Sequence, residues 1–227
     1  MEINATGDVT LHTAGKYCEE DILVRVPSVS TDELDAKYAE GYEAGYAEGY
    51  EDGAATSSVV ANALTKIIDR TIVEISDDNL KTVGGFAFRN CFSLETANFP
   101  NVTEVESYAF NNCYKLVNVN LPKVASINKN AFQTCSILAT VDLPKVTSIA
   151  ADAFSSSSKL ATLILRNTTR VASLANTSAL NGTAIKSGTG YVYVPAALVD
   201  SYKAATNWST YANQIRAIED YPEITGG

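Results

Sequence analysis

The central part of the chain repeats with a period of 22 residues. Four phenylalanines, each preceded by an alanine, keep this spacing: Phe88, Phe110, Phe132 and Phe154. Further apolar columns share it: Leu94, Leu116, Leu138 and Leu160; Phe99, Leu121, Leu143 and Leu165; and Val83, Val105, Ile127, Ile149 and Val171. A fixed period of this length is typical of chains that stack similar structural units. Five copies, the first and last incomplete, span roughly residues 72 to 171.

Each copy predicts one short strand and a compact return path. The segment from Leu116 to Pro122 reads Leu-x-x-Val-x-Leu-Pro, and such alternation before a proline is typical of a short strand that ends in a turn. The remainder, from Val124 to Phe132, has too few regularly spaced apolar residues for a long helix. Each copy should therefore form one coil of a solenoid, with strands of successive coils about 4.8 Å apart.

A single coil is too small to fold alone. Its few apolar side chains each contribute about 1.5 to 3 kcal/mol when buried. Fixing each backbone residue costs about 1 to 2 kcal/mol. Stability must therefore come from contacts between coils, and both ends of the stack need caps.

The repeat pattern also carries a family resemblance. The sequence Leu-x-x-Val-x-Leu-Pro-x-Val-x-x-Ile-x-x-x-Ala-Phe-x-x-Cys is similar to the BspA-like, treponemal-type leucine-rich repeat. The resemblance covers residues 72 to about 171 and implies a leucine-rich-repeat solenoid, in a family whose repeats serve adhesion and ligand binding. The fourth full copy departs from the pattern, with Ser157 at the cysteine position and Arg166 at the proline position. This departure indicates that the regular stack ends there.

Three cysteines occupy one column of the repeat: Cys91, Cys113 and Cys135. A metal site or a disulfide is one interpretation, but a ladder places three parallel thiols in a line, whereas zinc requires four converging ligands. We therefore expect small buried residues there and no metal, an interpretation that Ser157 in the same column favours. Cys18 lies outside the ladder, and the sequence shows no partner for it.

The acidic charge is concentrated in the first part of the chain. Residues 1 to 53 hold 13 acidic and 3 basic side chains, while residues 54 to 227 hold 13 acidic and 14 basic. Neither part has a basic patch interleaved with aromatic residues. This balance argues against a nucleic-acid partner.

A tyrosine and glycine pattern with a period of four runs from Thr31 to Gly53. The tyrosines are Tyr38, Tyr42, Tyr46 and Tyr50, and the glycines beside them are Gly41, Gly45 and Gly49. The period predicts a helix, although internal glycines cost up to about 1 kcal/mol each. Close packing of such helices, with a right-handed twist, favours a parallel homotrimer. A solvated, partly helical linker is the alternative.

Residues 1 to 29 are expected to form a small β unit, because both MEINATGDVTLHT and DILVRVPS alternate as strands do. The start of the chain lacks the basic and apolar stretches of a signal peptide, and no membrane insertion is expected. The segment VTLHTAGKYCEEDILVRVPS resembles the short N-terminal modules of phage minor structural and tail proteins from low-GC Gram-positive hosts. That resemblance implies docking to other virion proteins through residues 1 to 29.

Within the expected capping module and tail at residues 176 to 227, the segment TGYVYVPAALVDSYKAATNWSTYANQIRAI resembles the closing module of such repeat arrays. We expect a strand at Tyr191 to Val194, a helix opened by Pro195 that continues to about Ala205, and a loose polar tail. The aromatic residues Tyr193, Tyr202, Trp208 and Tyr211 are expected to cap the core, with a sugar-stacking site as the alternative.

The candidate ligand-binding residues lie on the exposed side of the predicted strands. They are Thr96, Asn98, Asn118, Asn120, Thr140, Asp142 and Thr162. Hydroxyl, amide and carboxylate groups at steps of about 4.8 Å can hydrogen-bond a glycan or an extended chain. The alternative is a polar surface that only keeps the solenoid soluble.

Catalytic residues are not expected. The only histidine is His12, and the sequence holds no nucleophile elbow, no His-x-x-x-His and no phosphate-binding glycine loop. We therefore expect no cofactor, and a glycan-active enzyme using Asp142 is disfavoured. Asp77 and Asp78 are adjacent and are interpreted as a turn.

Together these patterns predict an α+β, mostly β chain in four parts. A β anchoring unit (1–29) and a helical stalk or linker (30–56) precede a leucine-rich-repeat solenoid (57–175) and a capping module with a tail (176–227). The predicted function is a non-enzymatic, trimeric receptor-binding protein of a phage tail or related particle, assembled in the host cytoplasm, with a host-surface glycan or protein as ligand. The alternative is a BspA-like bacterial surface adhesin or protein-interaction module.

Overall fold

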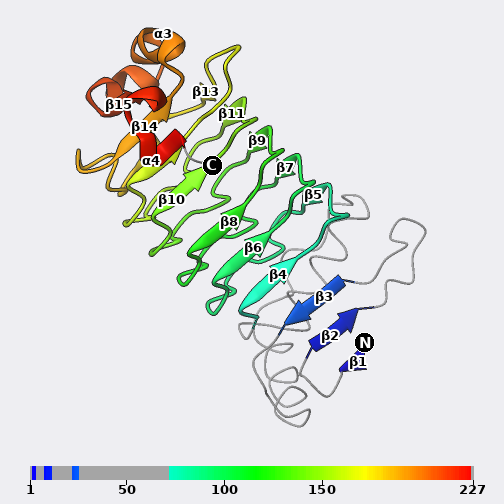
Figure 1. Ribbon diagram of the computed structural model, residues 1–227. Helices are drawn as coiled ribbons and strands as arrows, with labels where there is room; N and C mark the ends of the chain where they lie inside the picture. Colours follow the sequence, from blue (N-terminus) through cyan, green and yellow to red (C-terminus); the bar gives the residue numbers. More distant parts are fainter. Residues whose placement is uncertain (1, 4–7, 12–21, 26–71, 226–227) are drawn as a thin grey trace.

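The computed structural model describes residues 2–3, 8–11, 22–25 and 72–225. Residues 72 to 174 wind into successive coils, and each coil contributes one strand to each of two faces of the solenoid (Figure 1). The solenoid of stacked coils predicted from the 22-residue period is confirmed. In the described part of the chain, no helix is long and apolar enough to span a bilayer.

The first strand of each coil lies where the sequence predicts it. These strands are β4 (Glu74–Ser76), β6 (Thr96–Asn98), β8 (Asn118–Asn120), β10 (Thr140–Asp142) and β12 (Thr162–Ile164). Neighbours pair in parallel with an offset of 22 residues, so that Thr96 lies opposite Asn118. The ladder is interrupted between β8 and β10, which belong to two different sheets. Val119, in the middle of β8, is correspondingly only half-buried.

A second strand in each coil replaces the irregular return path that the sequence predicts. It contains two residues: β5 (Thr82–Val83), β7 (Glu104–Val105), β9 (Ser126–Ile127), β11 (Ser148–Ile149) and β13 (Ser173–Leu174). All five form one parallel sheet. Sequence patterns miss it because two residues are too few to show an alternation.

The last coil is longer than the others. Ile149 pairs with Leu174, so Leu174 and not Val171 continues the column of Val83, Val105 and Ile127. The placement of Val171 in this column was therefore wrong. The residues added to the loop after β12 shift the register of the final strand.

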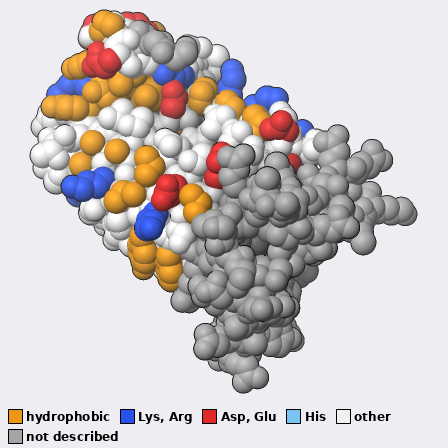
Figure 2. Space-filling view, turned by 60° about the horizontal axis from the view of Figure 1, so that its bottom comes forward, with side chains coloured by type: hydrophobic (Ala, Val, Ile, Leu, Met, Phe, Trp, Pro, Cys, Tyr) orange, Lys and Arg blue, Asp and Glu red, His pale blue; other side chains and the backbone are white. Residues whose placement is uncertain are grey.

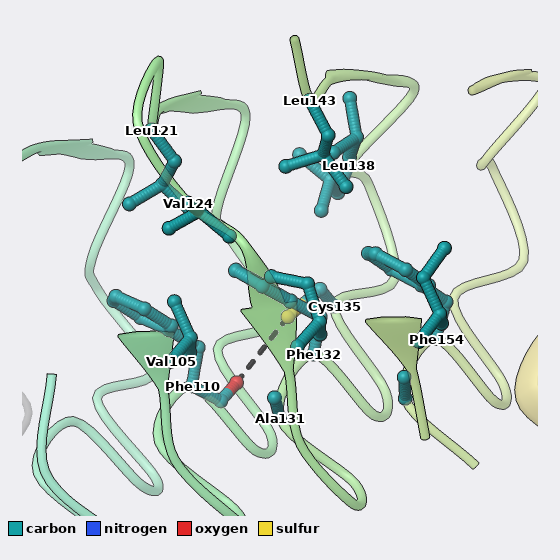
Figure 3. Close-up of a cluster of buried hydrophobic side chains, with 14 of the residues drawn as sticks. Val105, Phe110, Leu121, Val124, Ala131, Phe132, Cys135, Leu138, Leu143 and Phe154 are labelled. Carbon is teal, nitrogen blue, oxygen red and sulfur yellow. Dashed lines mark hydrogen bonds between the residues drawn. The ribbon is translucent and has the colours of Figure 1, made fainter. Parts of the chain in front are cut away.

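Phenylalanines stack through the centre of the solenoid. Phe88, Phe110, Phe132 and Phe154 lie with ring centroids 5.0 to 5.4 Å apart and nearly parallel planes. All four are at most 1% exposed. Figure 3 shows three of these rings in line, with leucine and valine side chains of each coil above them. Because the same residue type recurs in successive coils, identical side chains stack on one another and form a continuous core.

Each regular coil uses two left-handed backbone positions. One column is Phe86, Tyr108, Asn130 and Asp152, and the other is Asn90, Asn112, Thr134 and Ser156, all with φ between 58° and 64°. These residues turn the chain tightly between the second strand and the next coil. Asparagine tolerates this conformation best, and a β-branched residue such as Thr134 tolerates it worst.

Three N-terminal strands extend the first sheet. They are β1 (Glu2–Ile3), β2 (Asp8–Leu11) and β3 (Ile22–Arg25), which pair antiparallel in that order. In turn, β3 pairs antiparallel with β4 of the first coil. The predicted strands of residues 1 to 29 thus continue the solenoid sheet at its N-terminal end.

The C-terminal module contains two strands and several short helices. The strands are β14 (Tyr191–Val194), as predicted, and β15 (Ile215–Ala217), and both continue the sheet of β10 and β12. The 3-10 helices are η1 (Thr177–Leu180), η2 (Ala196–Leu198), η3 (Trp208–Gln214) and η4 (Ile218–Asp220). The α-helices are α3 (Val199–Ala204), where a helix after Pro195 was predicted, and α4 (Pro222–Thr225).

Side chains of the C-terminal module form hydrogen bonds with backbone groups of the last coil. Tyr202 Oη accepts from the amide of Ala172 at 2.9 Å, and Trp208 Nε1 donates to the carbonyl of the same residue at 2.6 Å. Asn207 donates to the Leu174 carbonyl, and Tyr211 donates to the Thr177 carbonyl. Tyr202, Trp208 and Tyr211 are at most 1% exposed, which confirms the capping interpretation for these three aromatic residues.

The tail is not loose as far as residue 225. Ile218 and Ile224 pack with Tyr193 and Tyr221 against Ile164 of β12. The expectation of a loose polar tail was wrong because Tyr221 and Ile224 meet an apolar patch on the sheet of β10, β12, β14 and β15.

Candidate functional site

The predicted binding residues lie together on the outer side of the first strands of the coils, which belong to two sheets. We call this surface the strand face: Thr96, Asn98, Asn118, Asn120, Thr140, Asp142 and Thr162. The residues between them point inward, and Ala97, Val141 and Leu163 are at most 1% exposed. Asn118, Asn120 and Thr140 are exposed, and the other four are half-buried. The structure thus brings all seven onto one surface, where the pleat of the strands predicts them.

An amide ladder connects three coils along this face. Asn120 Nδ2 donates to Asn98 Oδ1 at 2.7 Å, and Asn98 Nδ2 donates to Ser76 Oγ at 2.9 Å. The sequence analysis missed Ser76, although it lies 22 residues before Asn98. The ladder holds the asparagine side chains in place, so a ligand would meet them already oriented.

Asp142 forms an ion pair on the strand face. Arg166 Nε donates to its Oδ2 at 2.8 Å, and Arg166 Nη2 donates to the carbonyl of Ile224 at 2.7 Å. The other carboxylate oxygen, Oδ1, is buried without a hydrogen-bond partner. Arg166 therefore neutralises Asp142 and also ties the tail to the sheet. Sequence analysis noted Arg166 only as a departure from the repeat.

The strand face ends at β12 because the tail covers the next positions. Ile164 is 5% exposed and Tyr193 is 7% exposed, and both lie beneath the tail. The rings of Tyr193 and Tyr221 meet edge to face, with centroids 5.1 Å apart. Burial raises the pKa of the Tyr193 phenol, with smaller contributions from Tyr221 and Glu223. Tyr193 is therefore part of a small apolar cluster and is not available for sugar stacking.

Two further columns carry exposed aromatic residues on the first coils. Phe86 stacks on Tyr108 at 4.9 Å, and Phe92 stacks on Tyr114 at 5.1 Å. The Arg89 guanidinium lies 5.6 Å from the Phe86 ring centroid. Phe86 is 49% exposed and Tyr114 is 42% exposed. The sequence analysis did not single out these pairs, although their 22-residue spacing is visible in the sequence.

The cysteine column is buried and reduced. Cys91, Cys113 and Cys135 are thiols that form no disulfide and are at most 1% exposed. Desolvation raises the pKa of Cys113 and Cys135 well above the ordinary value for a thiol. Residues 72 to 225 and the short described N-terminal strands hold no group of three potential metal ligands. The interpretation of the column as small buried residues is confirmed, and Cys18 lies outside the described residues.

The predicted oligomerisation residues also lie outside the described residues. They are Tyr38, Tyr42, Tyr46, Tyr50, Gly41, Gly45 and Gly49. Their helix and its trimeric packing stay predictions. Asp77 is a turn residue as expected, since its Oδ1 accepts from the amides of Asn79 and Leu80.

Comparison with family models decides the family of the repeats. Residues 58–181 match the model of the BspA type leucine rich repeat region, in six copies. The chain belongs to this family. The match covers more than half of the chain and begins before the first copy recognised from its sequence. It includes the coils that carry the strand face.

Solved structures with the same type of fold come from several bacteria. A leucine-rich repeat protein from Bacteroides ovatus matches with a TM-score of 0.48 and 22% identity, over 65% of this chain and 37% of the other. The leucine-rich repeat protein of T. pallidum matches with a TM-score of 0.41 and 25% identity, over 55% and 52%. A leucine rich cell surface protein from Faecalibacterium prausnitzii matches with a TM-score of 0.44 and 15% identity, over 62% and 35%.

This chain thus matches between about a third and a half of the length of those proteins. No curated protein matches it.

Proposed function

We propose that this protein is a non-enzymatic receptor-binding protein whose strand face binds a glycan or a protein on a cell surface. The observation that carries the proposal is the strand face itself, where short polar groups recur from coil to coil on the outer side of the strands. Its amides are held by the ladder from Ser76 to Asn120. Oriented donors and acceptors reduce the entropy lost when a ligand binds.

We further propose that the protein belongs to a phage tail or a related particle. The support is the resemblance of residues 9 to 28 to modules of phage minor structural proteins and the tyrosine and glycine pattern that follows. In this proposal residues 1 to 29 dock to other virion proteins, residues 31 to 53 form a parallel trimer, and the solenoid points outward. Three weak sites on one stalk can gain about a hundredfold or more in effective affinity.

The alternative is a bacterial surface adhesin or interaction module of the BspA type. Membership of the family supports it, since such repeats serve adhesion. Both functions use the same strand face. They differ in the structure to which the protein is attached, which is a virion in the first proposal and a bacterial envelope in the second. Co-purification with phage particles would favour the virion, whereas recovery with the bacterial envelope in the absence of phage would favour the adhesin.

Binding of the fluorescently labelled full chain to a panel of low-GC Gram-positive cells tests the proposed function. We expect saturable binding to at least one host. The double variant Asn118→Arg with Thr140→Arg should abolish it, because two long charged side chains then obstruct the strand face. The matched control is Thr103→Arg with Ser173→Arg, which places the same charges at exposed positions of other coils away from this face. Equal loss in both variants would contradict a role for the strand face.

A further inference from the structure

An aromatic ring stands at the C-terminal end of the strand face. Thr162 lies opposite Thr140 of β10 on one side and opposite Tyr191 of β14 on the other. Cross-strand partners in a parallel sheet project to the same side. The Tyr191 ring therefore rises beside a floor formed by the short side chains of Thr162 and Thr140.

Neighbouring residues hold the Tyr191 ring in place. Arg216 of β15 lies with its guanidinium carbon 4.5 Å from the ring centroid. The same guanidinium donates to the carbonyls of Asn213 and Ile215 at 2.8 and 2.9 Å. Tyr193 contacts the ring edge to face at 6.3 Å.

The strand order β12, β14, β15 places Tyr191 between Thr162 on one side and Arg216 on the other. The ring is half-buried and also packs against the cluster of Ile164, Tyr193 and Ile218. It is thus a fixed wall beside Thr162, with part of its surface exposed.

Apart from the Arg216 guanidinium against the Tyr191 ring, the groups around this wall carry little net charge. Thr140, Thr162 and Asn118 are neutral, and Asp142 is paired with Arg166. In the space-filling view, uncharged side chains cover most of the described surface and charged ones are scattered (Figure 2). This electrostatic balance favours a ligand that is itself neutral and offers both donors and acceptors.

A pyranose ring matches this combination. Its C–H groups form an apolar side that packs flat against an aromatic ring, while its hydroxyls point outward to hydrogen-bond neighbouring side chains. An extended peptide would need a free strand edge or pockets for alternate side chains. At this end of the face both edges of β12 are paired, so the sugar fits better.

We propose that Tyr191, Thr162 and Thr140 form a subsite for one pyranose of a neutral oligosaccharide. The sugar stacks on the Tyr191 ring from the side of Thr162, and its hydroxyls hydrogen-bond the threonine hydroxyls and the Asn118 amide. The ligand continues along the strand face toward the N-terminal coils. This inference rests on the proposed function of the strand face.

The full chain, titrated with maltotriose, cellotriose and chitotriose by calorimetry and by saturation-transfer NMR, tests the subsite. We expect at least one to bind, with saturation transfer strongest at the C–H groups of one sugar. Tyr191→Leu should weaken binding at least about fivefold, as expected for the loss of one stacked ring. Tyr191→Phe keeps the ring and should bind nearly as the native protein does.

Two further variants control for indirect effects. Thr162→Val keeps the shape of the floor but removes a hydroxyl, and it should weaken binding severalfold. Tyr114→Leu removes an exposed aromatic ring far from the wall and should leave binding unchanged. Thermal unfolding of every variant confirms that the fold is retained. Binding of none of the three sugars, or equal loss in the variants at 191 and 114, would overturn the proposal.

Cell binding separates this inference from the proposed function. If Tyr191→Leu binds cells as the native protein does, the strand face remains a receptor-binding surface and the sugar subsite is wrong. If the native chain binds a trisaccharide but no cells, the subsite stands and the proposed function fails.

Discussion

Position 157 shows which kind of side chain the repeat requires three residues after each core phenylalanine. Cys113 donates its thiol hydrogen to the Phe88 carbonyl at 3.0 Å, and Cys135 donates to the Phe110 carbonyl at 3.3 Å (Figure 3). Ser157 donates to the Phe132 carbonyl at 2.7 Å in the same way. The position therefore requires a small side chain that can also donate a hydrogen bond. The sequence analysis predicted only the small size.

Ser157→Ala should lower the free energy of unfolding by about 1 to 3 kcal/mol. The change leaves two buried groups unpaired, because Ser157 Oγ also accepts from the amide of Cys135. Ser157→Cys restores the repeat and should cost less. Urea unfolding of both variants measures the difference, and equal stability of the two would contradict the role of the hydrogen bonds.

Thr134→Asn should stabilise the protein by about 1 kcal/mol. Thr134 is β-branched and has a φ of 61°, whereas the equivalent positions in the two preceding coils are Asn90 and Asn112. Those asparagines also hydrogen-bond each other, and a third could extend the pair. Thr134→Val keeps the branch and serves as the control in thermal unfolding. An asparagine variant no more stable than the valine variant would refute this explanation.

At the scale of elements, the two ends of the solenoid are closed in different ways. At the C-terminal end, side chains of α3 and η3 satisfy the backbone of the last coil and bury three large aromatic residues. At the N-terminal end, β3 pairs with β4 and covers the edge of the first strand. The first and last of these repeat strands, β4 and β12, therefore both pair with a strand beyond the repeats, which protects these ends against edge-to-edge association.

The C-terminal cap should lose stability between about pH 10 and pH 12. Burial raises the pKa of Tyr211 to about 12, compared with about 10 in the unfolded chain. The folded state thus holds this proton more tightly, so the contribution is complete below pH 10 and is lost as the pH rises through 12. Urea unfolding from pH 8 to 11.5 measures the slope.

Tyr211→Phe is the control for this pH dependence. It removes the titrating group, so stability should fall less steeply with pH in the variant, although burial of Tyr202 leaves a second phenol with a raised pKa. Parallel slopes for the native chain and the variant would show that Tyr211 does not cause the loss.

Sequence reasoning predicted the longer strands of the fold and missed the shortest strands and the packing of the tail. The first strands, the phenylalanine column and the strand at Tyr191 were predictable because each follows from spacing or alternation. The two-residue second strands are too short to show a period, and the tail packs only because its isoleucines and tyrosine find Ile164 at the sheet end. The strand face was predictable from the pleat, but its ladder and the Arg166 contact depend on side-chain conformations that no pattern specifies.

At the scale of the whole molecule, the strand face is one continuous surface only if the solenoid is rigid. The ladder from Ser76 to Asn120, the phenylalanine stack and the cap all act across coils, so a change in one coil affects its neighbours. Stability in such stacks is the sum of unit and interface contributions. A ligand that spans several coils should therefore stabilise the whole array.

The full chain should have a solution mass three times that of the 24.2 kDa monomer. A truncation starting at Ala54 would also remove β1 to β3 and uncover β4, so substitutions in the predicted helix test the trimer better. Replacing Tyr38, Tyr42, Tyr46 and Tyr50 by serine should give a monomer in light scattering. Replacing all four by phenylalanine preserves the packing surface and is the control. A monomeric native chain would contradict the trimer and favour the interpretation of the tyrosine and glycine segment as a linker.

Because the repeat has a fixed period of 22 residues, the length of the solenoid can change by whole coils. Duplication of one copy inside the regular part would insert a coil without altering β3 or the cap, because each internal coil contacts only coils like itself. The solenoid would lengthen by about 4.8 Å, and the strand face would gain one more pair of polar side chains in line with the others. Evolution can thus vary the number of ligand units that this surface accommodates in single steps, while the chemistry at either end stays the same.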